Sequence, residues 1–289
     1  MREFPRERVA AVVGREPVRW VERGGGYTGA GRWVVEFATG PSLFVKASEG
    51  PGGAAIRREA AVLEALSGSF HPHLIGFEDD DGYAIEVIED LSSARWPPPY
   101  PDDVGGLYDA LTELSEHAAP AGLRALERPP GSTWESLERT RGWVGDLAVC
   151  SNRWLDASID ALVAAERMFD PTGDDLVHND LWSGNIAFQG DRCVFIDWAE
   201  AHRGAAFVDT GFAMLSLRSE GFRSTTPRFD GDAAFASWWS ASLASRLTRG
   251  VESWLDPTIE QGLHQDLFFA LIWVSEVLDL PTPDGVDPR

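Results

Sequence analysis

The chain has 289 residues, 44% of them hydrophobic and 25% charged, an ordinary composition for a globular protein, and its length indicates about two domains or lobes. This composition excludes a wholly disordered chain, a collagen and a coiled coil. No apolar run approaches the roughly 18 residues of a membrane span, and the first residues lack the apolar stretch of a secretory signal. Two cysteines are too few for a disulfide framework, so we expect a protein of the reducing cytoplasm.

Charge is distributed unevenly along a chain whose formal net charge is −21. Residues 1–75 carry ten Lys and Arg against eight Asp and Glu, whereas the remainder carries fifteen against thirty-eight. Such acidity makes nucleic acid and anionic membranes poor partners and favours a cationic ligand of the second part. The alternative is that the acidic surface only aids solubility.

The first 91 residues predict a small antiparallel sheet with one inserted helix. Short β-type runs separated by turn residues predict strands at 18–23, 32–38, 42–48, 73–78 and 83–89. Between the third and fourth runs, apolar residues recur at helical spacing over 54–66. We therefore expect an N-terminal domain over residues 1–91.

The remaining residues, 92–289, predict a mainly helical second domain after a Pro-rich connector at 92–103. Helical patterns cover about 102–118, 133–149, 152–169, 206–218, 232–246 and 258–279. Ser132 and Glu135 form a candidate capping box at the start of the second of these helices. Three short β-type runs, at 175–180, 185–189 and 193–198, interrupt the helices.

The most informative motif lies in these short strands. His178, Asp180 and Asn185 have the spacing H-x-D-x-x-x-x-N, and Asp197 ends the apolar strand that follows. This pattern is typical of phosphoryl transfer, in which one carboxylate accepts the proton of an attacking hydroxyl. A second carboxylate and an amide oxygen can hold Mg²⁺ against a triphosphate. The alternative is a polar turn in which Asp and Asn cap local backbone groups.

Lys46 is the only lysine in a chain with 24 arginines, and it lies inside the apolar run LFVKA. A high-GC coding bias explains the arginines, but not the one position that remains lysine. A strand lysine held by a helix glutamate contacts the nucleotide phosphates in kinase-type sites, and arginine does not replace it there. Glu59 is the favoured partner, with Glu64 on the same helix as the alternative. The alternative is that Lys46 faces solvent and has no role in a site.

A glycine-rich segment, GGGYTGAG at 24–31, joins the first two predicted strands. Because it lies between two strands, it is neither a Walker A loop nor a dinucleotide fingerprint. Such a hairpin can fold over phosphates, with backbone N–H groups of Gly25 and Gly26 and the hydroxyl of Thr28 as candidate donors.

Taken together, VHNDLWSGNI, VFIDWAEA, GGGYTG and FVKA make the chain resemble the aminoglycoside phosphotransferase family of small-molecule kinases, relatives of choline and homoserine kinases. The resemblance spans about residues 20–215. It implies an α+β, bilobal protein-kinase-like fold, with an antiparallel N-terminal sheet carrying one helix and a mainly helical C-terminal lobe. It also implies Mg²⁺ and ATP, with GTP as the alternative nucleotide.

The resemblance also implies roles for individual residues. Asp180 would be the catalytic base, Asn185 and Asp197 the metal ligands, and Lys46 with Glu59 the phosphate contact. EVIEDL at 86–91 is similar to the family's interlobe hinge, which implies nucleotide contacts from Glu89 and Leu91. His178 and Asp209 would support the catalytic loop.

We expect the acceptor to be a cationic small molecule, an aminoglycoside or another polycationic antibiotic. Candidate substrate contacts are Trp182, Trp198, Glu200 and Glu276. One alternative is a metabolic kinase for an amino sugar or amino alcohol. A nucleotide-binding pseudokinase that acts as a scaffold is the alternative from another class. A monomer or weak homodimer is the expected assembly.

Overall fold

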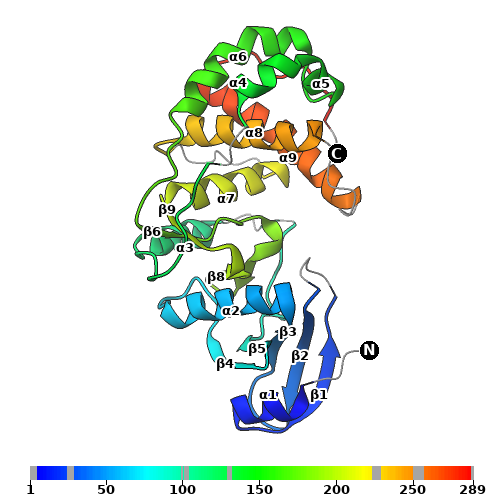
Figure 1. Ribbon diagram of the computed structural model, residues 1–289, viewed down its shortest axis with the longest axis vertical. Helices are drawn as coiled ribbons and strands as arrows, with labels where there is room; N and C mark the ends of the chain where they lie inside the picture. The colour runs from blue at the N-terminus through cyan, green and yellow to red at the C-terminus, as the bar shows by residue number, and fades with distance from the viewer. Residues whose placement is uncertain are drawn as a thin grey trace. The chain divides into compact units, whose positions relative to one another are not determined.

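The computed structural model describes residues 5–24, 29–98, 100, 104–128, 132–222, 229–249 and 257–287. The chain forms two compact units (Figure 1). The first contains residues 1–124 and 175–203, and the second contains residues 125–174 and 204–289. The domain boundary predicted between residues 91 and 92 falls inside the first unit, because residues 92–124 and 175–203, the latter called here the catalytic segment, pack with the N-terminal part.

A five-stranded antiparallel sheet dominates the first unit, in the order β1-β2-β3-β5-β4. Its strands are β1 (Pro17–Glu22), β2 (Gly31–Phe37), β3 (Leu43–Ser48), β4 (Leu74–Asp80) and β5 (Tyr83–Glu89). All five agree with the sequence prediction to within about two residues. Alternating β-branched and aromatic side chains explain this agreement, since they suit a pleated, buried surface.

The two faces of this sheet are covered by different helices (Figure 1). Helix α1 (Arg6–Val13) covers one face, where Val9 packs on an apolar cluster that includes Trp33, Val45 and Val87. Side chains alternate along a strand, so Lys46 lies on the opposite face, beneath helix α2 (Gly50–Ala65). The sheet thus has an apolar face and a face that carries charged side chains.

Helix α1 was not predicted from the sequence. Gly14, with φ +69°, ends it by donating its N–H to the carbonyl of Ala10 at 2.8 Å. A glycine directly after an apolar stretch is a recognised C-terminal signal, and it could have revealed this helix.

The first unit also holds the short elements of the catalytic segment. Helix α3 (Gly105–Ser115) packs against β6 (Asp175–Val177) and β8 (Arg192–Phe195), and β8 pairs with β7 (Ile186–Gln189). The 3₁₀ turn η2 (Ser183–Asn185) ends at the motif residue Asn185, and η3 (Trp198–Glu200) follows Asp197. Strand β9 (His202–Gly204) pairs with β6. The strand predicted over 175–180 is shorter than expected, because Asn179 turns the chain with φ +66°.

The second unit is helical, as predicted. Its helices are α4 (Trp134–Leu137), α5 (Arg141–Asp146), α6 (Asn152–Arg167), α7 (Phe207–Ser219), α8 (Asp232–Thr248) and α9 (Pro257–Leu278), and η1 (Glu138–Thr140) joins α4 to α5. The single helix predicted over 133–149 is therefore broken into short pieces. The capping box is also displaced by one residue: Thr133 and Ser136 form it, not Ser132 and Glu135.

An aromatic core holds the second unit together. The ring of Phe169 stacks on that of Trp238 with centroids 4.1 Å apart, and Phe235 contacts both. Among the helices whose residues are described, none combines the length and the apolar character needed to cross a bilayer.

The division into units changes how the negative charge is distributed. The first unit carries fourteen Lys and Arg against twenty-five Asp and Glu, a net charge of −11. The second carries eleven against twenty-one, a net charge of −10. The charge difference between residues 1–75 and the remainder therefore does not coincide with the two units, because residues 76–124 and 175–203 add their acidic groups to the first.

Candidate active site

The motif residues Asp180 and Asn185 are held together by a side-chain amide. Nδ2 of Asn185 donates to the backbone carbonyl of Asp180 at 2.8 Å and to its Oδ2 at 2.9 Å. Asn179, directly before Asp180, adopts a left-handed conformation that asparagine tolerates well. Because both amide protons are used toward Asp180, the amide oxygen of Asn185 remains as an acceptor that can bind a cation.

His178 and Trp198 support this loop from the core. Both side chains are fully buried, and their rings lie 4.5 Å apart. Nε2 of His178 donates to the carbonyl of Ile196 at 2.9 Å, and burial lowers the pKa of His178 to about 4. The indole N–H of Trp198 donates to the carbonyl of Phe195 at 2.8 Å. The expectation that Trp198 contacts substrate is corrected by this burial.

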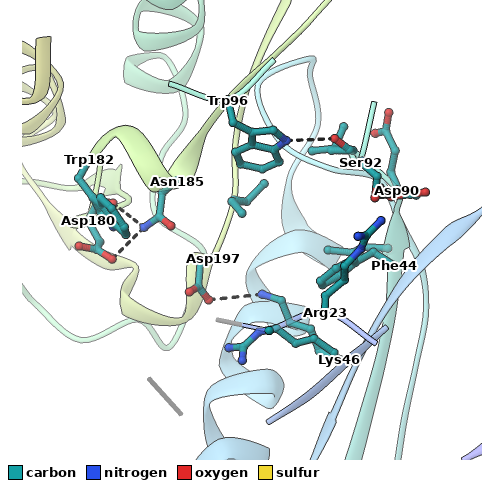
Figure 2. A pocket seen from close by; sticks show the side chains of 17 residues that line it. Arg23, Phe44, Lys46, Asp90, Ser92, Trp96, Asp180, Trp182, Asn185 and Asp197 are labelled. Carbon is teal, nitrogen blue, oxygen red and sulfur yellow. Dashed lines mark hydrogen bonds and ion pairs between the residues drawn. The ribbon is translucent and has the colours of Figure 1, made fainter. Parts of the chain in front are cut away.

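Asp197 lies beside the loop because its strand is tied to Asn185. The N–H of Ile196 donates to the carbonyl of Asn185 at 3.0 Å, and Asp197 then turns with φ +67°. This turn directs its carboxylate toward Lys46, whose Nζ lies 3.4 Å from Oδ1 (Figure 2). The ammonium of Lys46 lowers the pKa of Asp197 and outweighs the effect of burial.

Lys46 and Glu59 form a buried ion pair, with Nζ 2.6 Å from Oε2. Only 5% of Lys46 and 1% of Glu59 are exposed. Burial lowers the pKa of Lys46, but the charges of Glu59 and Asp197 outweigh it and raise the pKa overall. Glu59, rather than the alternative Glu64, is thus the helix partner of the lysine, and Lys46 is not a solvent-facing strand residue.

Glu86 adds a third carboxyl group that the sequence analysis did not single out. It pairs with Lys46 in the register of β3 and β5, and it is fully buried. Burial, and next the charge of Glu59, raise its pKa well above the ordinary value. Neither oxygen of Glu86 has a donor group as partner. Because two ionised carboxylates cannot hydrogen-bond to each other, an interaction between Glu86 and Glu59 requires a proton on one of them.

A pocket with a volume of about 670 Å³ contains most of these groups (Figure 2). Lys46, Asp180, Asn185 and Asp197 all line it. Every residue that lines this pocket belongs to the first unit. The sequence prediction that these side chains come together is therefore matched by the described geometry.

The predicted hinge residues also line the pocket. Glu89 lines the pocket, and its carboxylate forms an ion pair with Arg192 at 2.9 Å. The carbonyl of Leu91 accepts from the N–H of Ala94 at 2.9 Å and from the indole N–H of Trp96 at 3.3 Å. These contacts fix the backbone of the segment beside the pocket.

Among the lining residues missed from the sequence are Arg23, Arg32, Phe44 and Trp96. Phe44 precedes Lys46 by two residues and therefore shares its face of β3, a period-2 signal that was available. The arginines flank the glycine-rich segment, and Trp96 lies in the Pro-rich connector. Gly24 lines the pocket as well, whereas the candidate donors Gly25, Gly26 and Thr28 lie outside the described residues.

Asp180 has an electrostatic environment suited to a base. Burial, with a contribution from the charge of Asp197, raises its pKa to about 7. The charge of Glu200 raises it further, and the hydrogen bond from Asn185 lowers it. At neutral pH the group can therefore accept and release a proton with little free-energy cost.

Two predicted substrate contacts lie near Asp180: the N–H of Trp182 donates to its carbonyl at 3.2 Å, and Glu200 acts on it electrostatically. The ring of Trp182 is 47% exposed and lies over Gly184, where an added Cβ would come within 2.3 Å of the indole. Glu200 is half exposed, 3.7 Å from a guanidinium nitrogen of Arg58. Glu276 lies on α9 in the second unit and is ion-paired with Arg218 at 2.7 Å.

The donor set at Asn185 and Asp197 fits a magnesium ion that completes its coordination from phosphate and water. Mg²⁺ prefers hard oxygen ligands and usually takes only one or two from the protein. Within the described ranges, no group of three or more His, Cys, Asp or Glu side chains could hold a metal alone. Asn185 and Asp197 therefore suit a nucleotide-bound cation better than a permanent structural metal.

The fold resembles several solved small-molecule kinases. A fructosamine-3-kinase from Haemophilus somnus 129PT covers 91% of this chain and 96% of its own, with 14% identity and a TM-score of 0.52. A thermostable mutant of aminoglycoside phosphotransferase APH(4)-Ia, in ternary complex with ADP and hygromycin B, covers 98% and 99%, with 12% identity and a TM-score of 0.52. Amicoumacin kinase hAmiN, in complex with AMP-PNP, Ca²⁺ and Ami, covers 91% of both chains, with 10% identity and a TM-score of 0.54.

These likenesses establish the kinase-like α+β fold expected from the sequence. No protein among the curated ones matches the chain. The model of the phosphotransferase enzyme family matches residues 20–244, which include the glycine-rich segment, Lys46 and the whole catalytic motif. This match covers most of the sequence, and the chain therefore belongs to the phosphotransferase enzyme family.

Proposed function

We propose that the protein transfers the γ-phosphate of ATP to a hydroxyl of a cationic small molecule, an aminoglycoside or another polycationic antibiotic, and thereby inactivates it. One observation carries the transfer reaction: Lys46, Asp180, Asn185 and Asp197 line a single pocket in one compact unit. The family supports a phosphotransferase, and the acceptor class is the finer part of the proposal.

Each residue has a separate task in this reaction. Lys46, held by Glu59 at 2.6 Å, binds phosphate oxygens with a compact positive charge. Asp180, whose pKa is about 7, orients the acceptor hydroxyl and takes its proton as the oxygen attacks phosphorus. A magnesium ion on Asn185 and Asp197 would neutralise charge on the phosphates. Asn185 also keeps the Asp180 carboxylate in place through its amide.

The cationic acceptor is supported by the groups around Asp180. The half-exposed ring of Trp182 offers a face to a cation, and the carboxylate of Glu200 offers a negative charge nearby. The net charges of −11 and −10 on the two units attract a polycation over longer distances. We propose cytoplasmic action, where ATP is available and the two buried cysteines stay reduced.

A metabolic kinase for an amino sugar or amino alcohol is the second candidate. The carboxylate of Glu200, half exposed and paired with Arg58, favours this candidate. A small amino alcohol or amino sugar needs only one such carboxylate, and not the wider acidic surface. A scaffold that binds nucleotide without transfer is disfavoured by the complete set of catalytic side chains.

The decisive experiment measures acceptor-dependent ADP release from Mg·ATP with aminoglycosides, cationic peptide antibiotics, amino sugars and choline-like alcohols. The same panel with Mg·GTP decides the nucleotide. We expect turnover with a polycationic antibiotic that disappears in Asp180→Asn. Turnover only with a small amino alcohol or amino sugar would support the metabolic kinase. Nucleotide binding without any turnover would overturn the transferase assignment for this pocket.

A further inference from the structure

Three cationic side chains lie in a row across neighbouring strands at the pocket. Arg32 on β2 pairs with Lys46 on β3 in the sheet register. Arg23 follows β1 directly, and its N–H donates to the carbonyl of Arg32 at 2.8 Å. All three side chains line the pocket, and Figure 2 shows Arg23 on the same side as Phe44 and Lys46.

The row follows from the pleat of the sheet. Directly paired residues on adjacent strands project to the same face, so Arg32 shares the charged face with Lys46. Trp33, the next residue on β2, packs into the apolar cluster on the other face. Arg32 also lies close enough to Asp197 to interact electrostatically with its carboxylate. It therefore reaches the part of the pocket where Lys46 and Asp197 meet.

Without these arginines, the charges in the pocket would not favour the binding of a polyanion. Lys46 faces two carboxylates, Glu59 at 2.6 Å and Asp197 at 3.4 Å, so the three groups together are not positive. A nucleoside triphosphate brings several further negative charges. A guanidinium matches phosphate with two parallel hydrogen bonds, which an ammonium cannot make.

We propose that Arg32, assisted by Arg23, binds the phosphate chain of the nucleotide beside Lys46, an inference that rests on the proposed function of this pocket. Arg32 makes the main contact because it is directly paired with Lys46 and partly buried. Arg23 is exposed and contributes through a more strongly screened charge.

Affinity for ligands that differ only in phosphate number tests this assignment. Calorimetry at fixed Mg²⁺ compares ATP, ADP, adenosine and inorganic tripolyphosphate with the wild-type protein and with Arg32→Gln. We expect Arg32→Gln to weaken ATP and tripolyphosphate about 10-fold or more, because a charge-assisted hydrogen bond is lost. ADP weakens less, and adenosine stays within about twofold of wild type. Arg23→Gln follows the same order with smaller losses.

Arg19→Gln is the matched control. Arg19 lies on β1 of the same sheet, is ion-paired with Glu36 at 3.0 Å, and does not line the pocket. Its loss should leave ATP affinity unchanged. If Arg32→Gln does not fold, Arg32→Lys keeps the charge, removes the fork, and should still weaken ATP about threefold or more.

Two results would overturn the inference. One is unchanged ATP affinity in Arg32→Gln and Arg32→Lys, and the other is an equal loss for adenosine and ATP, which would indicate a general distortion of the pocket. In both cases the proposed function stands as long as wild-type turnover requires Asp180. Failure of the wild-type protein to bind ATP would instead overturn the proposed function together with this inference.

Discussion

Glu86 lies directly opposite Lys46 in the register of β3 and β5, and its carboxyl group is fully buried. The ammonium of Lys46 therefore interacts electrostatically with three acidic groups, those of Glu59, Asp197 and Glu86. Burying two carboxylates beside one lysine would be costly. The raised pKa of Glu86 favours its neutral form, which would remove most of this cost, and the ion pair with Glu59 at 2.6 Å holds Lys46 in place.

The first prediction concerns the dependence of stability on pH. Burial raises the pKa of Glu86 in the folded chain, whereas an unfolded glutamate loses its proton near pH ~4.3. The stability that Glu86 contributes is therefore complete below that pH and is lost as the pH rises toward its raised folded-state pKa. Glu86→Gln removes this loss, because glutamine does not titrate. The Tm of this variant should therefore increase relative to the Tm of the wild type as the pH rises from about pH 5 to pH 8. A constant Tm difference over that range would show that Glu86 is ionised in the folded state.

The second prediction concerns the base. Asp180→Asn should lower kcat by about 10²- to 10⁴-fold, because no group remains to take the proton of the acceptor. Affinity for Mg·ATP should change little, since Asn185 and Asp197 are intact. Single-turnover kinetics together with nucleotide titration measure both quantities. Near wild-type turnover in this variant would remove Asp180 from the reaction.

The third prediction concerns the metal ligands. Asp197→Ala should abolish turnover and weaken Mg·ATP binding, because it removes a charged ligand and a partner of Lys46 at 3.4 Å. Asn185→Ala should affect metal affinity less, since water can replace a neutral oxygen. It should nevertheless lower kcat, because the amide also holds Asp180 at 2.9 Å. Titration of activity with Mg²⁺ separates the two effects, and identical small changes in both variants would contradict the site.

The fourth prediction concerns the single lysine. Lys46→Arg should be nearly as damaging as Lys46→Ala, with kcat/KM lowered by about 10²-fold. The Lys46 side chain is 7% exposed and its ammonium lies 2.6 Å from Glu59, so a longer, planar guanidinium does not fit without displacing its neighbours. Steady-state kinetics of the two variants test this. A fully active arginine variant would mean that any cation at this position suffices.

The catalytic segment was predictable from the sequence because its chemistry is local. Asp180 and Asn185 are five residues apart in one loop, and Asp197 ends the following strand. The pairing of Lys46 with Glu59 was predictable because a strand followed by a helix brings their faces together. Trp198 was misassigned because its position next to Asp197 in the sequence does not reveal that its ring points into the core.

Other features depend on the register between strands, which spacing alone does not fix. Glu86 joins Lys46 on one face only once β5 is paired with β3, and a charged strand face suggests solvent exposure until α2 is known to cover it. Arg32 becomes a pocket residue only once β2 is paired with β3. The difference in charge between residues 1–75 and the remainder was likewise misleading, because the first folded unit combines residues 1–75 with acidic segments from the remainder.

The last prediction concerns attraction of the acceptor. Glu200 is about half exposed, close enough to Asp180 to raise its pKa, and only loosely paired with Arg58 at 3.7 Å. A cationic acceptor can therefore compete for it. Attraction between exposed charges is screened over a Debye length of ~8 Å at physiological salt. The KM of the acceptor should thus rise with ionic strength, while that of ATP changes less. Glu200→Gln should raise the acceptor KM about two- to fivefold and flatten this salt dependence.

Glu276 provides the comparison for Glu200. Its carboxylate is already bound to Arg218 at 2.7 Å, so a ligand must first break that pair. We therefore expect Glu276→Gln to raise the acceptor KM less than Glu200→Gln does. The same rate measurements at low and physiological salt test both variants. An acceptor KM that does not respond to salt in the wild-type protein would argue for a small amino alcohol or amino sugar, since a single positive charge gains little from the distant acidic surface.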